Sequence, residues 1–173
     1  ALAREMAPVF TAVVVGARVA ASMTAEIGSM AVTEQLDAMD ALNVDPIRYL
    51  VVPRFWAAVI MMPAVSLYSM LAALLGGMAV AASSLGIGPR KYYMVTQQFA
   101  HMTDFATGLS KTFFFGALIA LVGCHYGFRA SGGAEGVGRA TTTSVVVTLV
   151  LILVWDYIHT SWAVAITGLL VGQ

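Results

Sequence analysis

The sequence predicts an all-α protein, a polytopic membrane helix bundle that forms a single transmembrane domain over residues 1–173. Composition gives the first reason: 60% of the residues are hydrophobic and only 10% are charged, whereas soluble domains carry about 25% charged residues. The mean hydropathy of +0.85 agrees with a bilayer environment. The apolar residues also gather in long runs without the alternation of barrel strands, so the runs are interpreted as helices.

Four apolar runs reach the length of about 20 residues that a helix needs to cross the hydrocarbon core. We expect these spans at about residues 8–30, 55–82, 105–128 and 144–170. Small residues occur within them and permit close packing between helices. Those singled out are Gly16, Ala17, Ala20, Ala21, Gly76, Gly77 and Gly116.

Two of the connectors between the spans have contrasting compositions. In residues 83–104, Pro89 predicts a helix start, and aromatic and apolar residues then recur at helical spacing. This pattern predicts a short helix at the membrane interface. Residues 129–143 are rich in glycine and polar residues, so we expect a loop there, with threonines 141–143 supplying cap oxygens to the last span.

The remaining connector, residues 31–54, contains the acidic stretch TEQLDAMDALNVDP. We expect a short helix with Thr33 as its N-cap and a stop near Asn43 and Pro46. Acidic and apolar side chains fall on opposite faces of this helix. The acidic ones are Glu34, Asp37 and Asp40, and the apolar ones are Leu36, Met39 and Leu42. An acidic face suits a protein partner with basic groups better than an anionic lipid surface, and the alternative is an ordinary solvated helix.

Charged side chains within spans are rare, and they are usually paired or functional. Arg18 and Glu26 share one helix face, so either they meet through the polar residue between them or each contacts another helix. Asp156 and His159 lie three residues apart in the last span. Lys111 lies near the start of its span, where we expect its side chain to reach toward the interface. Each group is interpreted either as structural or as part of a transport path.

Catalytic and nucleotide-binding functions find little support in the sequence. The glycine-rich connector lacks the lysine of a P-loop, and the three histidines lack the spacing of metal ligands. Ser110 and Lys111 are adjacent and therefore point to different helix faces, which disfavours a Ser–Lys pair. Cys124 is the only cysteine and is interpreted as a small buried hydrophobic residue. The sequence predicts neither an enzyme nor a metal site.

Five segments in order resemble the MlaE family, which comprises the permease subunits of lipid-transporting ABC systems that work with MCE proteins. The segments are AREMAPV (3–9), GARVAASMTAEIGSM (16–30), TEQLDAM (33–39), VDPIRYLVVPRFWA (44–57) and GVGRATT (136–142). The resemblance covers nearly the whole chain. It implies a complete subunit of five spans that begins with an interfacial helix, so we expect that helix and one further span to precede this stretch.

The resemblance also implies a homodimer in the inner membrane of a diderm bacterium, or in a chloroplast envelope, that moves phospholipid between the membrane and an MCE protein. A separate cytoplasmic ATPase would bind ATP and Mg²⁺, so no cofactor is expected in this chain. The connector at 31–54 corresponds to the family's coupling helix, which would place 31–54 and 129–143 in the cytosol and 83–104 outside. Its ATPase-contacting residues would be Glu34, Gln35, Leu36, Asp37, Met39 and Asp40.

The family's Arg-Glu-Leu-Gly-Pro motif matches residues 4–8, where Met6 and Ala7 replace leucine and glycine. The resemblance implies a lipid cavity at the dimer axis. Its lining residues would be Arg4, Glu5, Met6 and Val9.

Two other functions remain open. One is a secondary transporter or channel that needs no ATPase, and the other is a membrane scaffold that anchors partners. The polar path of the first would use Arg18, Glu26, Asp156 and His159. The acidic helix outside the membrane favours the ATP-driven permease, because a secondary transporter needs no docking element for a motor.

Overall fold

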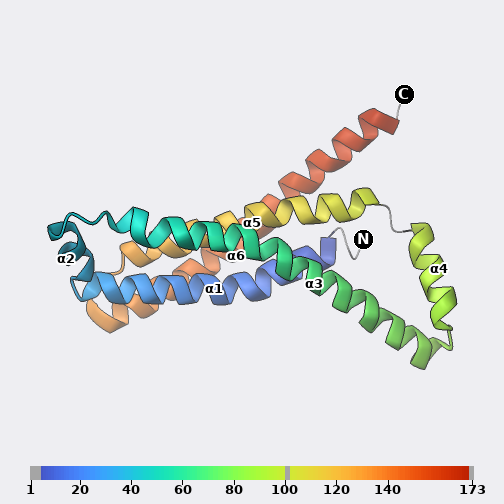
Figure 1. The fold of residues 1–173 in the computed structure, drawn as a ribbon, viewed down its shortest axis with the longest axis horizontal. Helices are drawn as coiled ribbons and strands as arrows, with labels where there is room; N and C mark the ends of the chain where they lie inside the picture. Colours follow the sequence, from blue (N-terminus) through green and yellow to red (C-terminus); the bar gives the residue numbers. More distant parts are fainter. Residues whose placement is uncertain (1–4, 100–101, 172–173) are drawn as a thin grey trace.

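The computed structural model describes residues 5–99 and 102–171, and every regular element in these ranges is helical (Figure 1). The elements are α1 (Ala7–Val32), α2 (Gln35–Ala41), the π-helical η2 (Ile47–Val51), α3 (Val52–Leu85), α4 (Pro89–Phe99), α5 (Met102–Phe128) and α6 (Gly133–Val171). Four stretches are long and apolar enough to cross a membrane: Ala7–Val32, Ile47–Leu85, Phe105–Phe128 and Gly133–Ala165. The all-α class and the four predicted spans are confirmed.

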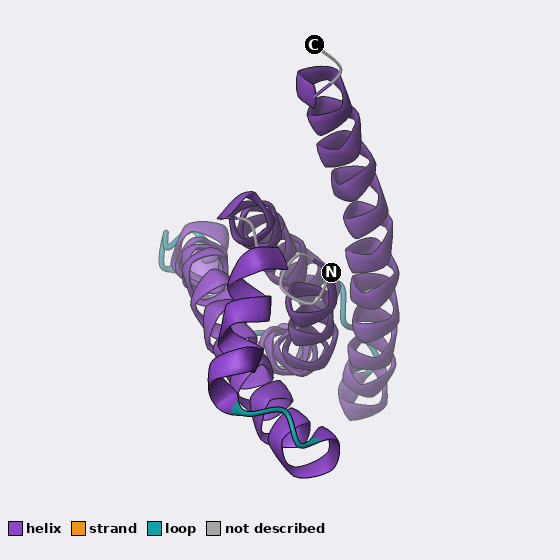
Figure 2. Cartoon of the chain, turned by 90° about the vertical axis from the view of Figure 1, so that its right-hand side faces the viewer, coloured by secondary structure: helices purple, strands orange, loops and turns teal. Residues whose placement is uncertain are grey.

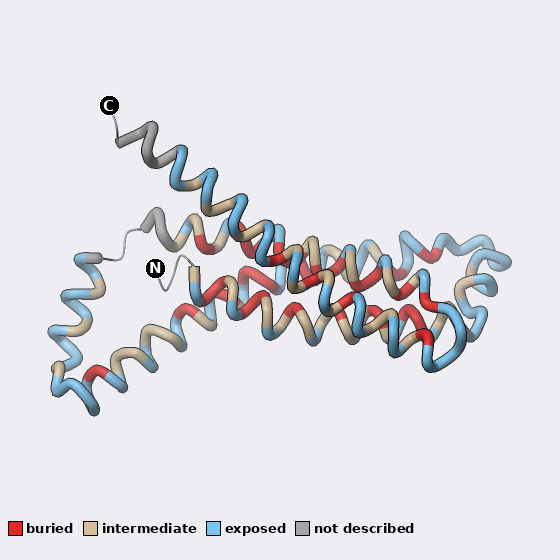
Figure 3. The backbone as a smooth tube through the Cα atoms, turned by 180° about the vertical axis from the view of Figure 1, so that it is seen from behind, coloured by how far each residue is buried: buried red, intermediate tan, exposed pale blue. Residues whose placement is uncertain are grey.

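Helices α1 and α5 form the centre of the bundle, because each contacts the other and also both α3 and α6. Helix α2 contacts α1 at one end of the bundle, and α4 contacts α3 near the other end. Figure 2 shows that the C-terminal part of α6 extends away from the remaining helices. Burial follows this arrangement, since buried residues concentrate along the middle of the bundle while α2 and α4 are largely exposed (Figure 3).

The hydrophobic core draws side chains from all four spanning helices. Its buried members are Ala12, Ala20, Met62, Phe115, Ile119 and Ile152. Small residues let the helices approach closely, as is usual in membrane bundles. A Cβ on Gly116 would lie 2.5 Å from the carbonyl oxygen of Ala58 on α3, and one on Gly16 would lie 2.8 Å from Ile119. The predicted packing role is confirmed for these two glycines, whereas a Cβ on Gly76 would have no neighbour within 4 Å.

A buried hydrogen-bond network joins α1, α5 and α6. The hydroxyl of Thr24 donates to the carbonyl of Gly123 at 2.9 Å and shares a hydrogen bond with the hydroxyl of Ser144 at 2.8 Å. Thr24 and Ser144 are fully buried. Hydroxyl bonds of this kind supplement van der Waals packing between spanning helices, where the hydrophobic effect contributes little.

The segment predicted as an interfacial helix forms α4, which begins at Pro89 as expected. The chain reverses between α3 and α4 at Gly86, whose φ of +63° suits glycine. The hydroxyl of Tyr92 on α4 would lie 2.6 Å from a Cβ on Gly77 of α3. Gly77 therefore also has the predicted packing role, and α4 folds back against the end of α3.

The prediction of a loop over residues 129–143 is wrong from Gly133 onward, because α6 begins there. The turn before it is short, and Gly132 and Gly133 have φ values of +87° and +70°. Glycine adopts such values without the steric cost that other residues incur. The chain therefore reverses at two adjacent glycines, whereas the composition predicted a loop of fifteen residues.

The first turns of α6 are stabilised by bonds within the helix. Glu135 and Arg139 form an ion pair at 3.1 Å across one turn. The hydroxyls of Thr141 and Thr142 donate to the carbonyls four residues earlier, at 2.8 Å and 3.1 Å. The predicted capping role of the threonines is therefore wrong, because their oxygens are engaged along the helix rather than at its start.

Candidate functional site

A buried charge cluster joins the start of the described chain, α5 and α6. The side chain of Lys111 is fully buried, and its Nζ lies 2.6 Å from Glu5 Oε2 and 2.6 Å from Asp156 Oδ1. An isolated buried ammonium is strongly unfavourable, so the two carboxylates provide the compensation that allows this burial. The expectation that Lys111 reaches toward the interface is wrong, because its counter-charges lie inside the bundle. We call Lys111, Glu5 and Asp156 the Lys111 cluster.

Hydroxyl groups extend the polar contacts around the Lys111 cluster. The hydroxyl of Thr160 on α6 lies 3.2 Å from both carboxylate oxygens of Glu5, to which it donates. One turn away, the hydroxyl of Ser110 and His159 Nε2 lie 3.1 Å apart. Asp156 and His159 therefore each bind a residue of α5. Within residues 5–99 and 102–171, no three His, Cys, Asp or Glu side chains gather as metal ligands.

An open groove with a volume of about 750 Å³ lies beside the Lys111 cluster. Its lining residues are Glu5, Leu153, Asp156, Tyr157, Thr160, Ser161 and Val164. Sites for small molecules typically have volumes of roughly 300–1,000 Å³, with apolar walls and a few placed polar groups. This groove has both kinds of wall, since the carboxylates and hydroxyls lie beside leucine, valine and tyrosine. It can therefore hold an amphiphilic molecule. We call it the α6 groove.

The predicted lipid-binding residues occupy different positions around the α6 groove. Glu5 lines it, and the neighbouring Met6 is 56% exposed. Val9 is partly buried and packs against the hydrophobic core, and Arg4 lies outside the described residues. Their contact with lipid stays a prediction. The link that Lys111 forms between Glu5 and Asp156 was not predicted, although a lysine in an apolar run already signals a partner within the membrane.

The other intramembrane charges lie elsewhere in the bundle. Glu26 on α1 forms an ion pair with Arg54 on α3, with Oε1 and Nη2 2.8 Å apart. Of the two alternatives for Glu26, contact with another helix is therefore confirmed. Arg18 is exposed on α1 and forms no ion pair with any described residue. Glu26 follows Glu5 by 21 positions, which corresponds to roughly 30 Å along a helix, so the four predicted polar residues do not gather at one place.

Helix α2 lies at the end of the bundle opposite the Lys111 cluster (Figure 1). None of its seven residues is buried. Leu36 and Met39 are partly buried, while Asp37 and Asp40 are exposed, as the amphipathic pattern predicts. The third residue of the predicted apolar face, Leu42, departs from it, because it lies at the C-cap and is 77% exposed. Gln35 is exposed at the first position of the helix. Helix α2 thus presents acidic side chains on a surface that no other described element covers.

The predicted N-cap of this helix is wrong. Thr33 instead ends α1, and its hydroxyl donates to the carbonyl of Ser29 at 2.8 Å. Glu34 occupies the N-cap position of α2 with a φ of +58° and makes no side-chain capping bond. The physical reason is that α1 continues to Val32, so only two residues remain to reverse the chain. The predicted stop is confirmed, since Asn43 adopts a φ of +59° just after α2.

Comparison with known proteins agrees with this architecture. The family model described as Permease MlaE matches residues 1–162. A probable ABC transporter permease protein of Synechocystis sp. is 44% identical over 161 residues, which are 93% of this chain and 61% of that protein. A probable ABC transporter permease protein of Rickettsia typhi is 42% identical over 159 residues, 92% of this chain and 61% of that protein.

A third relative, a probable ABC transporter permease protein of Pyropia yezoensis, is 35% identical over all 173 residues of this chain. These residues correspond to 66% of that protein. The chain thus spans about three fifths of the length of the first two relatives. The match to the family model extends from the segment that holds Glu5 to the part of α6 that holds Asp156 and Thr160. With its four helices of spanning length, this chain is a multi-pass membrane protein that belongs to the MlaE permease family.

Proposed function

We propose that this chain is the permease subunit of an ABC transporter that moves phospholipid between the inner membrane of a diderm bacterium and an MCE protein. Two copies form the permease, and a separate cytoplasmic ATPase binds ATP with Mg²⁺ and hydrolyses it. The observation that carries the proposal is that the two ends of the bundle differ. An exposed acidic helix lies at one end, and an amphiphilic groove lies toward the other. The relatives named as ABC transporter permeases support the same conclusion.

The α6 groove offers a phospholipid two kinds of contact. Leu153, Tyr157 and Val164 provide apolar surface for acyl chains, and Glu5, Asp156 and Thr160 provide polar contacts for a headgroup. Such a site lets a phospholipid leave the bilayer without exposing its chains to water. The chemistry that transport demands from this subunit is therefore binding and release rather than catalysis.

A second copy of the chain is proposed to close the α6 groove. The C-terminal part of α6 extends beyond the other helices (Figure 2). Tyr157 and Trp162 are 75% and 71% exposed there. Packing this part of α6 against a twofold-related copy would cover these side chains and enclose the groove between two subunits. The lipid cavity would then lie at the dimer axis.

Helix α2 is proposed as the element that couples the permease to the ATPase. It connects α1 and α3 through short turns, so a displacement of α2 is transmitted directly to two spanning helices. Its exposed Asp37 and Asp40 suit a partner surface with basic groups. An ATPase can shift the permease between two states only if it binds them differently, and α2 would provide that differential contact.

The two alternative functions make different demands on the structure. A channel or secondary transporter would need its charged groups along one path, but Glu26 pairs with Arg54 far along α1 from the Lys111 cluster. A scaffold subunit would need no groove. The two experiments below separate the ATP-driven permease from both.

Reversing the charge of α2 is expected to abolish coupling. In the full-length protein, Asp37→Lys together with Asp40→Lys should prevent copurification of the ATPase and reduce ATP-dependent phospholipid transfer at least about tenfold, because like charges across an interface cost several kcal/mol. Both positions are exposed, so the permease itself should still fold. Copurification and transfer from labelled proteoliposomes are the measurements.

The matched control for this experiment is Glu135→Lys, which reverses an exposed acid outside α2. It should leave ATPase binding unchanged. If the α2 variant retains both the ATPase and lipid transfer, the assignment of α2 as the coupling helix is wrong.

Filling the α6 groove is expected to block phospholipid transfer without releasing the ATPase from the permease. Leu153→Trp adds bulk to the apolar wall, so phospholipid transfer should fall about tenfold while the ATPase still copurifies. Val150→Trp is the control, because Val150 is a similarly exposed residue of α6 that does not line the groove. Equal transfer by the two variants would show that lipid does not pass through this groove.

A further inference from the structure

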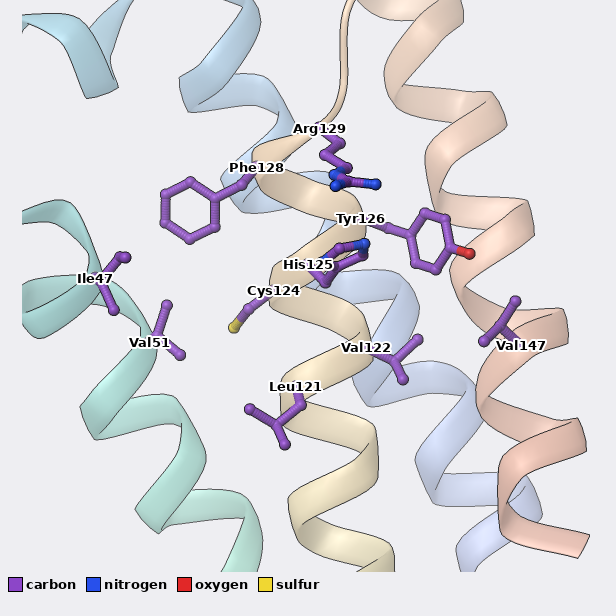
Figure 4. Close-up of a pocket in the computed structure, with 10 residues that line it drawn as sticks. All are labelled: Ile47, Val51, Leu121, Val122, Cys124, His125, Tyr126, Phe128, Arg129 and Val147. Atoms are coloured by element: carbon purple, nitrogen blue, oxygen red, sulfur yellow. The ribbon is translucent and has the colours of Figure 1, made fainter. Parts of the chain in front are cut away.

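A second groove, with a volume of about 740 Å³, is lined by η2, which follows α2, by the second half of α5 and by α6. Figure 4 shows its apolar wall, to which η2, α5 and α6 contribute. The wall includes Ile47, Val51, Leu121, Cys124, Phe128 and Val147. All these residues belong to the stretches of spanning length. We call this surface the α5 groove.

Polar side chains lie at one end of the α5 groove. Arg129 follows the last residue of α5, and Figure 4 shows its guanidinium above His125 and beside Tyr126. An arginine directly after a spanning helix lies at the level where lipid phosphates are found. The groove therefore complements a phospholipid: its cationic end at the interface suits the phosphate, and its apolar wall along the helix suits an acyl chain.

The arginines around this end of the bundle are paired, with one exception among the described residues. Arg48 pairs with Asp45, Arg54 with Glu26, and Arg139 with Glu135. Arg129 is exposed and forms no ion pair with a carboxylate of residues 5–99 or 102–171. Among the residues that line the α5 groove, Arg129 is the only arginine, lysine or carboxylate, so the groove itself has one unpaired positive charge, which complements an anion such as a phosphate.

We propose that the α5 groove binds one anionic phospholipid as a resident ligand, with the phosphate on Arg129 and an acyl chain along Val51 and Leu121. Lipid is favoured over a protein partner because the wall belongs to helices of spanning length, which bilayer lipid surrounds. The site is distinct from the proposed transport groove, since Arg129 follows Lys111 by 18 positions, or roughly 27 Å along α5. The bound lipid bridges η2 and α5 and so holds the segment that follows α2.

Lipid titration into the full-length permease with its ATPase tests this proposal. Delipidated complex in neutral detergent is titrated with dioleoyl phosphatidylglycerol, and bound lipid is counted by native mass spectrometry. Arg129→Gln should raise the Kd about fivefold, since one basic residue near the membrane surface contributes about that factor. Arg139→Gln, which removes the same charge from a paired arginine nearby, should leave the Kd unchanged, and Arg129→Lys should retain most of the affinity.

Two further arms identify the ligand. Glycerol 3-phosphate, which has the phosphate but no acyl chains, should not compete with the lipid. Val51→Trp, which fills the apolar wall and keeps Arg129, should weaken lipid binding and covers the case in which Arg129→Gln does not fold.

Three results would overturn the proposal. The first is the same Kd for Arg129→Gln and Arg139→Gln, and the second is effective competition by glycerol 3-phosphate. The third is loss of the ATPase from Arg129→Gln with lipid affinity unchanged, which would make this end of the groove a protein interface. None of these results depends on phospholipid transfer through the α6 groove. The lipid site in the α5 groove is therefore tested independently of the proposed transport function.

Discussion

Replacing Lys111 with methionine is expected to destabilise the bundle by about 3–5 kcal/mol, because it leaves two carboxylates near each other without their cation. Methionine keeps much of the length and apolar contact of the lysine side chain, so the lost charge is the main change. The side chains of Glu5 and Asp156 are 32% and 21% exposed, and the resulting hydration favours the lower end of this range. The free energy of unfolding, measured by denaturant titration in mixed micelles, gives the test.

Removing all three charges together should restore most of this loss. In the triple variant Lys111→Met, Glu5→Gln and Asp156→Asn, no buried charge lacks a partner, and neutral replacement of such networks is often nearly neutral for stability. Arg139→Gln, which breaks an exposed pair, should change stability by less than about 1 kcal/mol. If the triple variant is as unstable as Lys111→Met alone, packing rather than charge determines the effect.

Gly116→Ala is expected to separate α3 from α5 and to cost about 1–3 kcal/mol. The new Cβ would lie 2.5 Å from the carbonyl oxygen of Ala58 and 2.9 Å from the Cα of Val59, and backbone atoms cannot move aside as a flexible side chain can. The same measurement of unfolding free energy applies.

Gly76→Ala is the matched control for this substitution. Gly76 lies in the interior of α3, and its Cβ would meet nothing within 4 Å. Alanine is the better helix former, so this variant should be more stable by up to about 1 kcal/mol. Equal effects of the two substitutions would contradict the close α3–α5 contact.

The positions of the spanning helices could be predicted because the length of an apolar run is itself the physical requirement for crossing a bilayer. The beginning of α6 could not be predicted in this way. Four glycines and three threonines between Gly132 and Thr143 have the composition of a loop, yet the segment from Gly133 is helical. Glu135 pairs with Arg139 within this segment, and a Cβ on Gly136 would collide with the carbonyl oxygen of Ser131; composition reveals neither feature.

The residues of the candidate site could be predicted from the sequence better than the ion pairs between them. Asp156 stood out as an acid within an apolar run and Lys111 as a base near the start of one, whereas Glu5 was singled out only through the family motif at residues 4–8. Their association could not be read from one sequence, because the partners lie 106 and 45 positions from Lys111. The error at Thr33 has a different cause. A threonine between two helices can end the first or begin the second, and only the true length of α1 decides between them.

The separation of the partners of Lys111 along the chain has a consequence for biogenesis. Synthesis proceeds from the N-terminus, so Lys111 enters the membrane after Glu5 has been made but 45 residues before Asp156. A lysine costs about 2.5–3.5 kcal/mol at the centre of an inserting helix and less near its start, where Lys111 lies. Of the two described carboxylates that pair with Lys111, only Glu5 is present to offset this cost at that stage. Helix α5 is therefore held first beside α1, and α6 then arrives with the second carboxylate. A nascent chain that stops before α6 is therefore expected to keep an incompletely neutralised ammonium within the bundle.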